Sequence, residues 1–219
     1  MIIAVCGMKR EARIAAGASV VTVVGGSSGR LRERLESVMA GARGVISIGI
    51  AGALSPQLKP GDVIVASAIL SRGKFFAADS AWSERLVARL PGAMLLPIAG
   101  TDALIATAAE KARMFDATGA HTADMESHIA AEIAESRGLP LACLRIVADA
   151  AASDLPACAS VALTSEGKVN LAAVLGSVLK RPRQIPHVLR MARESNAAFA
   201  ALFRGRALLG DGLLGPDRL

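Results

Sequence analysis

Residues 140–149 read PLACLRIVAD, a nearly unbroken apolar run that ends in one acidic residue, Asp149. A run without alternating polar positions has no face to offer to water, which indicates a strand buried on both sides. Strands of this kind are typical of parallel sheets that helices cover on both faces. We therefore expect an α/β fold with Asp149 at the end of a central strand.

Other short apolar runs alternate with helical patterns along the chain. Strands are expected at 1–6, 19–24, 44–50, 62–70, 93–97 and 118–123, and helices at 9–16, 28–39, 80–89, 107–115 and 125–137. This alternation predicts a three-layer α/β/α arrangement around a mostly parallel, mixed central sheet. Because ligands bind beyond the carboxyl ends of the strands in such sheets, polar residues at those ends are the candidates for a site.

The length of 219 residues fits one domain with a terminal extension. We expect residues 180–219 to form a basic amphipathic helical extension, because apolar residues from Ile185 to Phe203 recur at helical spacing among arginines. Such a helix either packs on the sheet as an ordinary last helix or lies on an anionic membrane or a lipid-binding cleft.

Composition narrows the classes of function. The net charge of +6 fits a phosphorylated substrate, an anionic membrane surface or a solvated face. With no Tyr and one Trp, the chain lacks the stacking residues of a single-stranded nucleic-acid site, so we expect no nucleic-acid partner. The three cysteines have no metal-ligand spacing, so we expect no metal and a reduced, cytoplasmic protein. No apolar stretch is long enough to span a bilayer.

Three carboxylates and a glycine-rich turn stand at the expected strand ends. Asp149 is poorly solvated there, which suits a general acid that keeps its proton, although it also fits a helix cap. Glu126 opens a helix, where the helix dipole alone would favour it. Glu11 follows the first strand. The turn at 25–30, GGSSGR, either presents N–H groups to an anion or only joins a strand to a helix.

Three ordered motifs carry a resemblance. They are SIGIAGALSPQLKPGDVIVAS at 47–67, ADMES at 123–127 and RIVADA at 145–150. Together they resemble the purine nucleoside phosphorylase and methylthioadenosine/S-adenosylhomocysteine nucleosidase superfamily, over about two-thirds of the chain. The resemblance implies an enzyme that cleaves the bond between a purine base and a ribose.

The resemblance also implies a role for each carboxylate. Asp149 matches the Asp that gives a proton to N7 of the departing base, and Glu126 matches the Glu that binds the ribose hydroxyls. Glu11 matches the Glu that positions a water nucleophile in the hydrolases. A neutral Asp and an ionised Glu would then divide the catalytic work. The implied substrate-binding residues are Met125, Gly49, Ile50, Ala51, Gly52, Leu104 and Ile105.

Several residues depart from the family pattern. Leu104 stands where a stacking Phe is common, and Ile50 stands where the nucleosidases have a hydroxyl-bearing residue. The chain is also too short between Glu11 and Val20 for the extra hairpin of the nucleosidases. Lys9 and Arg10 replace acidic neighbours of Glu11, and this reversal of charge favours an anionic nucleophile such as phosphate. The candidate phosphate-binding residues are Arg13, Arg30, Ser27 and Ser28, with Lys9 and Arg10 beside them.

The GMKREARIA start and the GIAGAL segment look most like the hopanoid-associated phosphorylases. That resemblance implies release of adenine from adenosylhopane by phosphorolysis, with inorganic phosphate as co-substrate and no cofactor. The superfamily resemblance implies a homo-oligomer. The hydrophobic substrate would lie in or near a membrane, and the basic C-terminal helix is an independent indication that this cytoplasmic protein contacts the inner membrane face. Two alternatives stay open: hydrolysis by a methylthioadenosine/S-adenosylhomocysteine nucleosidase, and a nucleoside-binding protein without catalysis.

Overall fold

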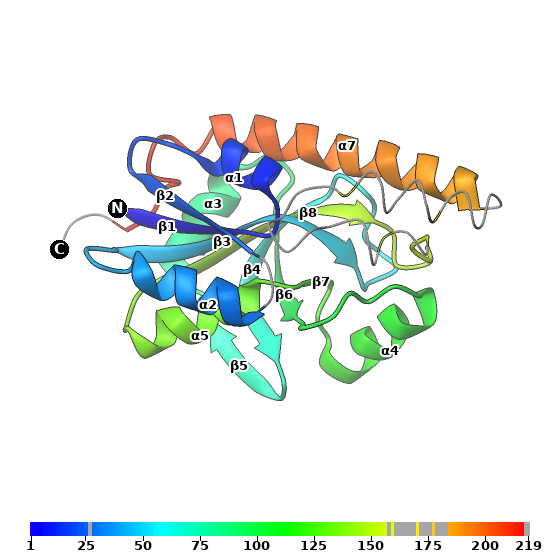
Figure 1. The fold of residues 1–219 in the computed structure, drawn as a ribbon, viewed down its shortest axis with the longest axis horizontal. Helices are drawn as coiled ribbons and strands as arrows, with labels where there is room; N and C mark the ends of the chain where they lie inside the picture. The colour runs from blue at the N-terminus through cyan, green and yellow to red at the C-terminus, as the bar shows by residue number, and fades with distance from the viewer. Residues whose placement is uncertain (26–27, 157–158, 160–169, 171–176, 178–183, 217–219) are drawn as a thin grey trace.

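The computed structural model describes residues 1–25, 28–156, 159, 170, 177 and 184–216. Strands and helices alternate through most of this chain, as Figure 1 shows. In chain order the elements are β1 Ile2–Cys6, α1 Lys9–Ala15, β2 Val20–Val24, α2 Ser28–Ser37, β3 Gly44–Ala53, β4 Val63–Ser71, β5 Lys74–Ala77, α3 Ser80–Arg89, β6 Met94–Gly100, α4 Ala108–Thr118, β7 Thr122–Asp124, α5 Ser127–Ser136, β8 Leu141–Asp149 and α7 Ile185–Ala207.

The strands form one mixed sheet in the order β2-β1-β3-β7-β6-β4-β5, with β8 paired to both β3 and β4. The pairs β1–β2, β1–β3, β3–β8, β4–β6 and β6–β7 are parallel, whereas β3–β7, β4–β8 and β4–β5 are antiparallel. The predicted mixed sheet flanked by helices is therefore confirmed. Because β3 pairs with both β7 and β8, the strands β3, β8, β4, β6 and β7 also close into a ring, which the sequence did not predict.

Two apolar cores cover the two faces of the sheet. Along β1, Ile3 and Val5 face a core shared with α2 and α5, while Ile2 and Ala4 face a core shared with α1, α3 and α7. This alternation is what a strand covered on both faces requires. All nine residues of β8 are buried, as the opening run of apolar residues predicted.

Some element boundaries differ from the predicted ones. β3 continues past Ile50 to Ala53, where it pairs with both β7 and β8, with a shift of register between Ala51 and Gly52. β5 was not predicted at all. It is joined to β4 by a tight hairpin, in which Arg72 and Gly73 both have positive φ, 51° and 74°. An arginine in that conformation is uncommon, so the sequence carries no hairpin signal.

The C-terminal helix α7 packs on the sheet. Its buried residues Ala198, Phe199 and Leu202 join the core on the side of α1 and α3. Among the described residues, no helix combines the length and apolar character needed to cross a membrane.

Candidate active site

A cavity of about 460 Å³ opens where the chain leaves β1, β3, β6 and β8. Its wall is mostly apolar, but the carboxyl groups of Glu11, Glu126 and Asp149 all reach it. The cavity therefore lies at strand ends, as the fold predicted. The other lining residues are Gly7, Met8, Arg10, Ile50, Ala51, Gly52, Leu54, Thr101, Ala103, Leu104, Ile105, Lys111, Ala123, Asp124, Met125, Ala148, Leu155, Ala159, Val188, Met191, Ala192, Ser195, Asn196 and Phe199.

A buried ion pair supports the floor of the cavity. Arg145 donates from Nε to Oδ2 of Asp124 over 2.9 Å and from a terminal nitrogen to the Ser47 hydroxyl over 2.5 Å. The other oxygen of Asp124 accepts the backbone N–H groups of Glu126 and Ser127, at 2.8 and 2.7 Å. Burial alone would raise the pKa of Asp124, but Arg145 and these hydrogen bonds leave it below the usual range. Asp124 and Arg145 thus fix the start of α5, which carries Glu126.

Glu11 is held by backbone groups of two elements. Its Oε2 accepts the Met8 N–H at the start of α1, and its Oε1 accepts the Ile50 N–H of β3, both at 2.8 Å. Burial raises the pKa of Glu11, although Arg145 and these hydrogen bonds oppose the shift. The side chain is 2% exposed, so it is preorganised at the cavity wall.

Glu126 interacts electrostatically with the carboxyl groups of Asp124 and Glu11 and with the guanidinium of Arg145. Burial and the charges of Asp124 and Glu11 raise the pKa of Glu126 to about 8, against the opposing charge of Arg145. The sequence led us to expect an ionised Glu126, whereas this environment keeps it protonated at neutral pH. A protonated carboxyl can both donate and accept, which suits a pair of hydroxyl groups.

Asp149 ends β8 and forms a buried ion pair that the sequence did not reveal. Lys111 of α4 donates to its Oδ2 and also to the carbonyl oxygens of Ala150 and Ser153, at 3.0 and 2.8 Å. Burial raises the pKa of Asp149 more than Lys111 lowers it. The poorly solvated acid expected from the sequence is therefore present, but with a cation against it.

The structure places most of the predicted substrate-binding residues around the cavity. Met125, Ile50, Ala51, Gly52, Leu104 and Ile105 line it. Gly49 instead lies behind Glu11, because a Cβ there would come within 2.6 Å of the Glu11 Cδ. Its expected place in the cavity wall is thus taken by its neighbours, and its contact is with a carboxyl group.

The predicted phosphate-binding residues are mostly elsewhere. Arg13 and Arg30 are exposed and do not line the cavity. Ser28 donates its hydroxyl to Asp102 over 3.3 Å, and Ser27 lies outside the described residues. Arg10 does line the cavity, where its guanidinium stacks on Phe199 at 4.1 Å from the ring centre and donates to the Asn196 side chain over 2.9 Å.

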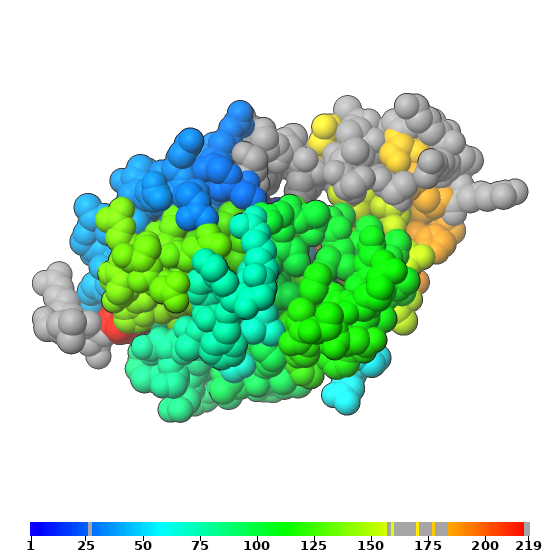
Figure 2. Space-filling view, turned by 90° about the horizontal axis from the view of Figure 1, so that it is seen from below, coloured from blue at the N-terminus to red at the C-terminus, as the bar shows by residue number. Residues whose placement is uncertain are grey.

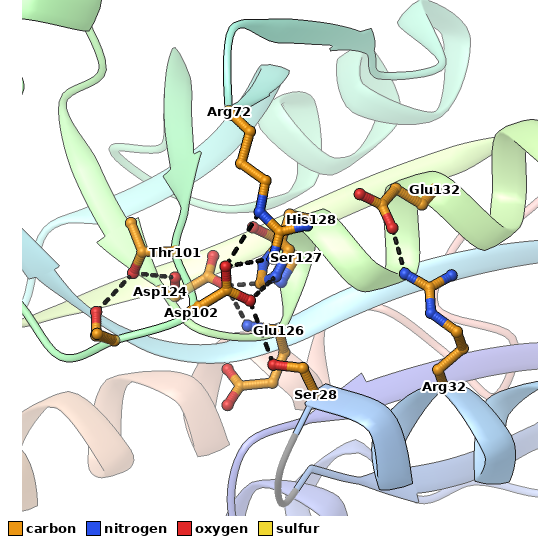
Figure 3. Close-up of polar contacts among 11 residues, drawn as sticks. Ser28, Arg32, Arg72, Thr101, Asp102, Asp124, Glu126, Ser127, His128 and Glu132 are labelled. Carbon is orange, nitrogen blue, oxygen red and sulfur yellow. Dashed lines mark hydrogen bonds and ion pairs between the residues drawn. The ribbon is translucent and has the colours of Figure 1, made fainter.

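A second polar cluster, centred on Asp102, includes Ser28, Arg72 and His128 (Figure 3). Arg72 donates to one oxygen of Asp102 from Nε over 3.0 Å, and His128 lies 3.3 Å from the other oxygen. The hydrogen bonds from Arg72 and the positive charge of its guanidinium both lower the pKa of Asp102. Between the β4–β5 hairpin and α4, which stand side by side in Figure 2, there is a hollow of about 420 Å³.

Sequence reasoning missed Lys111, Arg145 and Asp124 as parts of the site. Arg145 had a usable signal, because it is a charged residue inside a run expected to be buried, and buried charges need partners. Asp124 had no such signal, because it lies between the strand expected at 118–123 and the helix expected at 125–137. Lys111 had none, since a lysine on an amphipathic helix is ordinarily solvated. Within the described part of the chain, no cluster of His, Cys, Asp or Glu has the makings of a metal site.

A mixed α/β sheet with buried carboxyl groups around an apolar cavity at its strand ends fits an enzyme of the nucleoside phosphorylase and nucleosidase type. The sequence profile of the Phosphorylase superfamily matches residues 7–181, so the chain belongs to that superfamily. The chain is therefore an enzyme of the nucleoside phosphorylase and nucleosidase type, which cleaves nucleoside glycosidic bonds. No curated protein matches the sequence at a significant level.

Solved structures of the same fold cover nearly the whole chain. The 5′-methylthioadenosine/S-adenosyl homocysteine nucleosidase of Campylobacter jejuni is 16% identical, with a TM-score of 0.61, and the match covers 93% of this chain and 98% of that one. Futalosine hydrolase of Helicobacter pylori is 14% identical, with a TM-score of 0.63 and coverage of 94% and 96%. At these identities the likeness establishes the fold alone.

Proposed function

We propose that this enzyme releases adenine from an adenine nucleoside with a large apolar 5′ substituent, namely adenosylhopane, by phosphorolysis. The observation that carries the proposal is the composition of the cavity wall. Helix α7 lines the cavity with the apolar residues Val188, Met191, Ala192 and Phe199, and with the polar residues Ser195 and Asn196. An apolar wall of this kind suits a hydrocarbon group better than a polar one.

The chemistry follows from where the carboxyl groups stand. As the C–N bond breaks, its electron pair stays on the base, and Asp149 gives the base a proton. Glu126 binds the ribose hydroxyls, and Met125 packs against the sugar. The carboxyl oxygens of Glu126 and Glu11 stabilise the positive charge that develops on the ribose. Glu11 lies where it can orient the nucleophile.

Phosphate is the proposed nucleophile, and Arg10 is the cation that supports it. Arg10 is the arginine of the predicted basic group that lines the cavity, next to Glu11. Its planar guanidinium matches the geometry of a phosphate. Arg13 and Arg30 would need a different arrangement of the chain to take part.

Hydrolysis of methylthioadenosine or S-adenosylhomocysteine is a second candidate, favoured by a different observation. Glu11 is fixed by two backbone N–H groups in a position that can orient water, and only one of the predicted phosphate-binding arginines is near. Structural neighbours described as 5′-methylthioadenosine/S-adenosyl homocysteine nucleosidases are consistent with this candidate.

Mass spectrometry of the products distinguishes the candidates. Adenosylhopane and methylthioadenosine are each incubated with the enzyme, with and without inorganic phosphate. Adenine together with a sugar phosphate, formed from adenosylhopane only when phosphate is present, supports the proposal. Adenine formed at a rate indifferent to phosphate rejects phosphorolysis, and no adenine from either substrate supports a binding protein without catalysis.

We also propose a homo-oligomer that contacts the inner membrane face through the first half of α7, where Ile185 and Leu189 are 43% and 53% exposed. Basic residues beside them, such as Arg190, would favour an anionic bilayer. Leu189→Glu should weaken association with anionic liposomes, and binding equal to that of the wild type would reject this contact.

Analytical ultracentrifugation over a dilution series tests the oligomer.

A further inference from the structure

Lys111 is the one fully buried lysine in the described part of the cavity wall, with 1% exposure. Its ammonium group has three protons and three acceptors: Oδ2 of Asp149 and the carbonyl oxygens of Ala150 and Ser153. Every donor of the ammonium is therefore used by the last residue of β8 and the segment that follows it. A lysine rarely gives up its hydration in this way unless each donor is satisfied.

The contact divides the two oxygens of Asp149 between different tasks. Lys111 occupies Oδ2, whereas Oδ1 accepts no hydrogen bond from the described residues. The carboxyl group lies against Gly52, where a Cβ would come within 3.3 Å of Oδ1 and 3.4 Å of Oδ2. Held from one side by the ammonium and packed on a glycine, the carboxyl group is fixed with one oxygen left for a ligand.

Stability alone does not account for this pair. A buried ion pair is usually no more stabilising than apolar residues of the same volume, because both charges lose their hydration. α4 already has its own N-terminal cap, in which Thr107 and Glu110 hydrogen bond reciprocally. The placement of the cation beside the acid thus points to the chemistry of the site.

We propose that Lys111 is a positioning residue for Asp149, which holds Oδ2 so that Oδ1 faces the departing base. This inference rests on the proposed function, because it assumes that Asp149 protonates a leaving base. Lys111 itself forms no bond to the substrate. Its effect should therefore be confined to leaving groups that need a proton.

The test compares two substrates across Lys111→Met, Asp149→Asn and the double variant. One substrate is the adenine nucleoside that the wild type cleaves best, and the other is 4-nitrophenyl riboside, whose phenolate departs without a proton. On the adenine nucleoside, each single variant should lose about 100-fold or more in kcat, the usual share of a general acid. On 4-nitrophenyl riboside, the loss should stay within about 10-fold.

The double variant isolates the path of the effect. If Lys111 acts through Asp149, the double variant is no slower than Asp149→Asn, because residues that act as a unit are not additive. Equal losses on both substrates, or losses that multiply in the double variant, would overturn the inference. Thermal unfolding verifies that each variant is folded, and Lys111→Gln replaces Lys111→Met if the latter does not fold. A wild type that cleaves 4-nitrophenyl riboside but no adenine nucleoside would instead reject the proposed function.

Discussion

Glycines leave the space that the carboxyl groups of the site occupy. A Cβ at Gly7 would lie 2.8 Å from Oε1 of Glu126, and one at Gly49 would lie 2.6 Å from Cδ of Glu11 and 3.0 Å from a terminal nitrogen of Arg145. Such distances are too short for real contacts, so a side chain at either position would force the carboxyl group to move. The glycines of these motifs are therefore needed for close approach, rather than for an unusual backbone conformation.

Gly49→Ala should lower kcat/KM for adenine release by about 100-fold, because the added Cβ displaces the carboxyl group of Glu11 from its position in the site. Gly29→Ala is the matched control, since a Cβ at Gly29 meets nothing within 4 Å. The control should retain wild-type kinetics and thermal stability. Wild-type activity in Gly49→Ala would show that the position of Glu11 is unimportant for the reaction.

Glu126 should make stability depend on pH. Its pKa rises from 4.5 to about 8 in the folded protein, mainly through burial and the charge of Asp124. Below about pH 4.5 the carboxyl group is protonated in both the folded and the unfolded state, and its contribution to stability is fully present. As the pH rises toward 8, the unfolded chain loses the proton while the folded chain keeps it, so stability falls; above the folded pKa it falls no further.

Glu126→Gln cannot ionise and should escape this loss. We compare the unfolding free energy of the variant with that of the wild type at about pH 5 and about pH 9. The difference should shift in favour of the variant by on the order of 3 kcal/mol from the lower pH to the higher. Urea denaturation at both pH values measures the difference. Glu33→Gln, an exposed position on α2, is the control and should follow the wild type. A Glu126→Gln variant that also follows the wild type would show that Glu126 ionises normally.

Among the elements, α7 contributes part of the cavity wall. Ala192 lines the cavity, whereas Ala197, one turn and a half further on the same helix, does not. Ala192→Trp should fill the space for a large 5′ substituent and lower kcat/KM for such a substrate by about 10-fold or more, while adenosine is affected less. Ala197→Trp should leave both rates unchanged. Equal losses for both substrates in Ala192→Trp would mean that α7 does not contact the 5′ group.

The elements also show how far sequence reasoning extends. β1 and β8 were predictable, because a strand buried on both faces must be apolar throughout. β5 and the end of β3 were not, since they depend on a hairpin with an arginine at positive φ and on long-range pairing of small residues. Glu11, Glu126 and Asp149 could be placed at one edge of the sheet from the sequence. The partner of Asp149 could not, because nothing in the pattern of α4 shows that Lys111 points inward.

At the scale of the whole molecule, the question is whether α7 folds as an extension, as the sequence suggested, or as part of one cooperative core. Phe199 is 6% exposed in the core shared with α1 and α3, while Phe203, one turn later, is 66% exposed. Arg206 further links α7 to the end of α1 by donating to the carbonyl oxygens of Ala15 and Ala16, at 3.1 and 2.9 Å. These contacts favour a single folding unit.

The two phenylalanines provide a matched test of that unit. Phe199→Ala should lower the free energy of global unfolding by about 3 kcal/mol, because it removes a buried aromatic ring and leaves a cavity, whereas Phe203→Ala should change it by less than about 0.5 kcal/mol. Both are measured by urea denaturation, followed by the fluorescence of Trp82, a fully buried residue of α3 in the same core. If α7 folds separately, Phe199→Ala leaves the Trp82 transition where it is in the wild type. A single transition that moves with Phe199 alone means that the helix lining the cavity is held by the same core that holds the sheet.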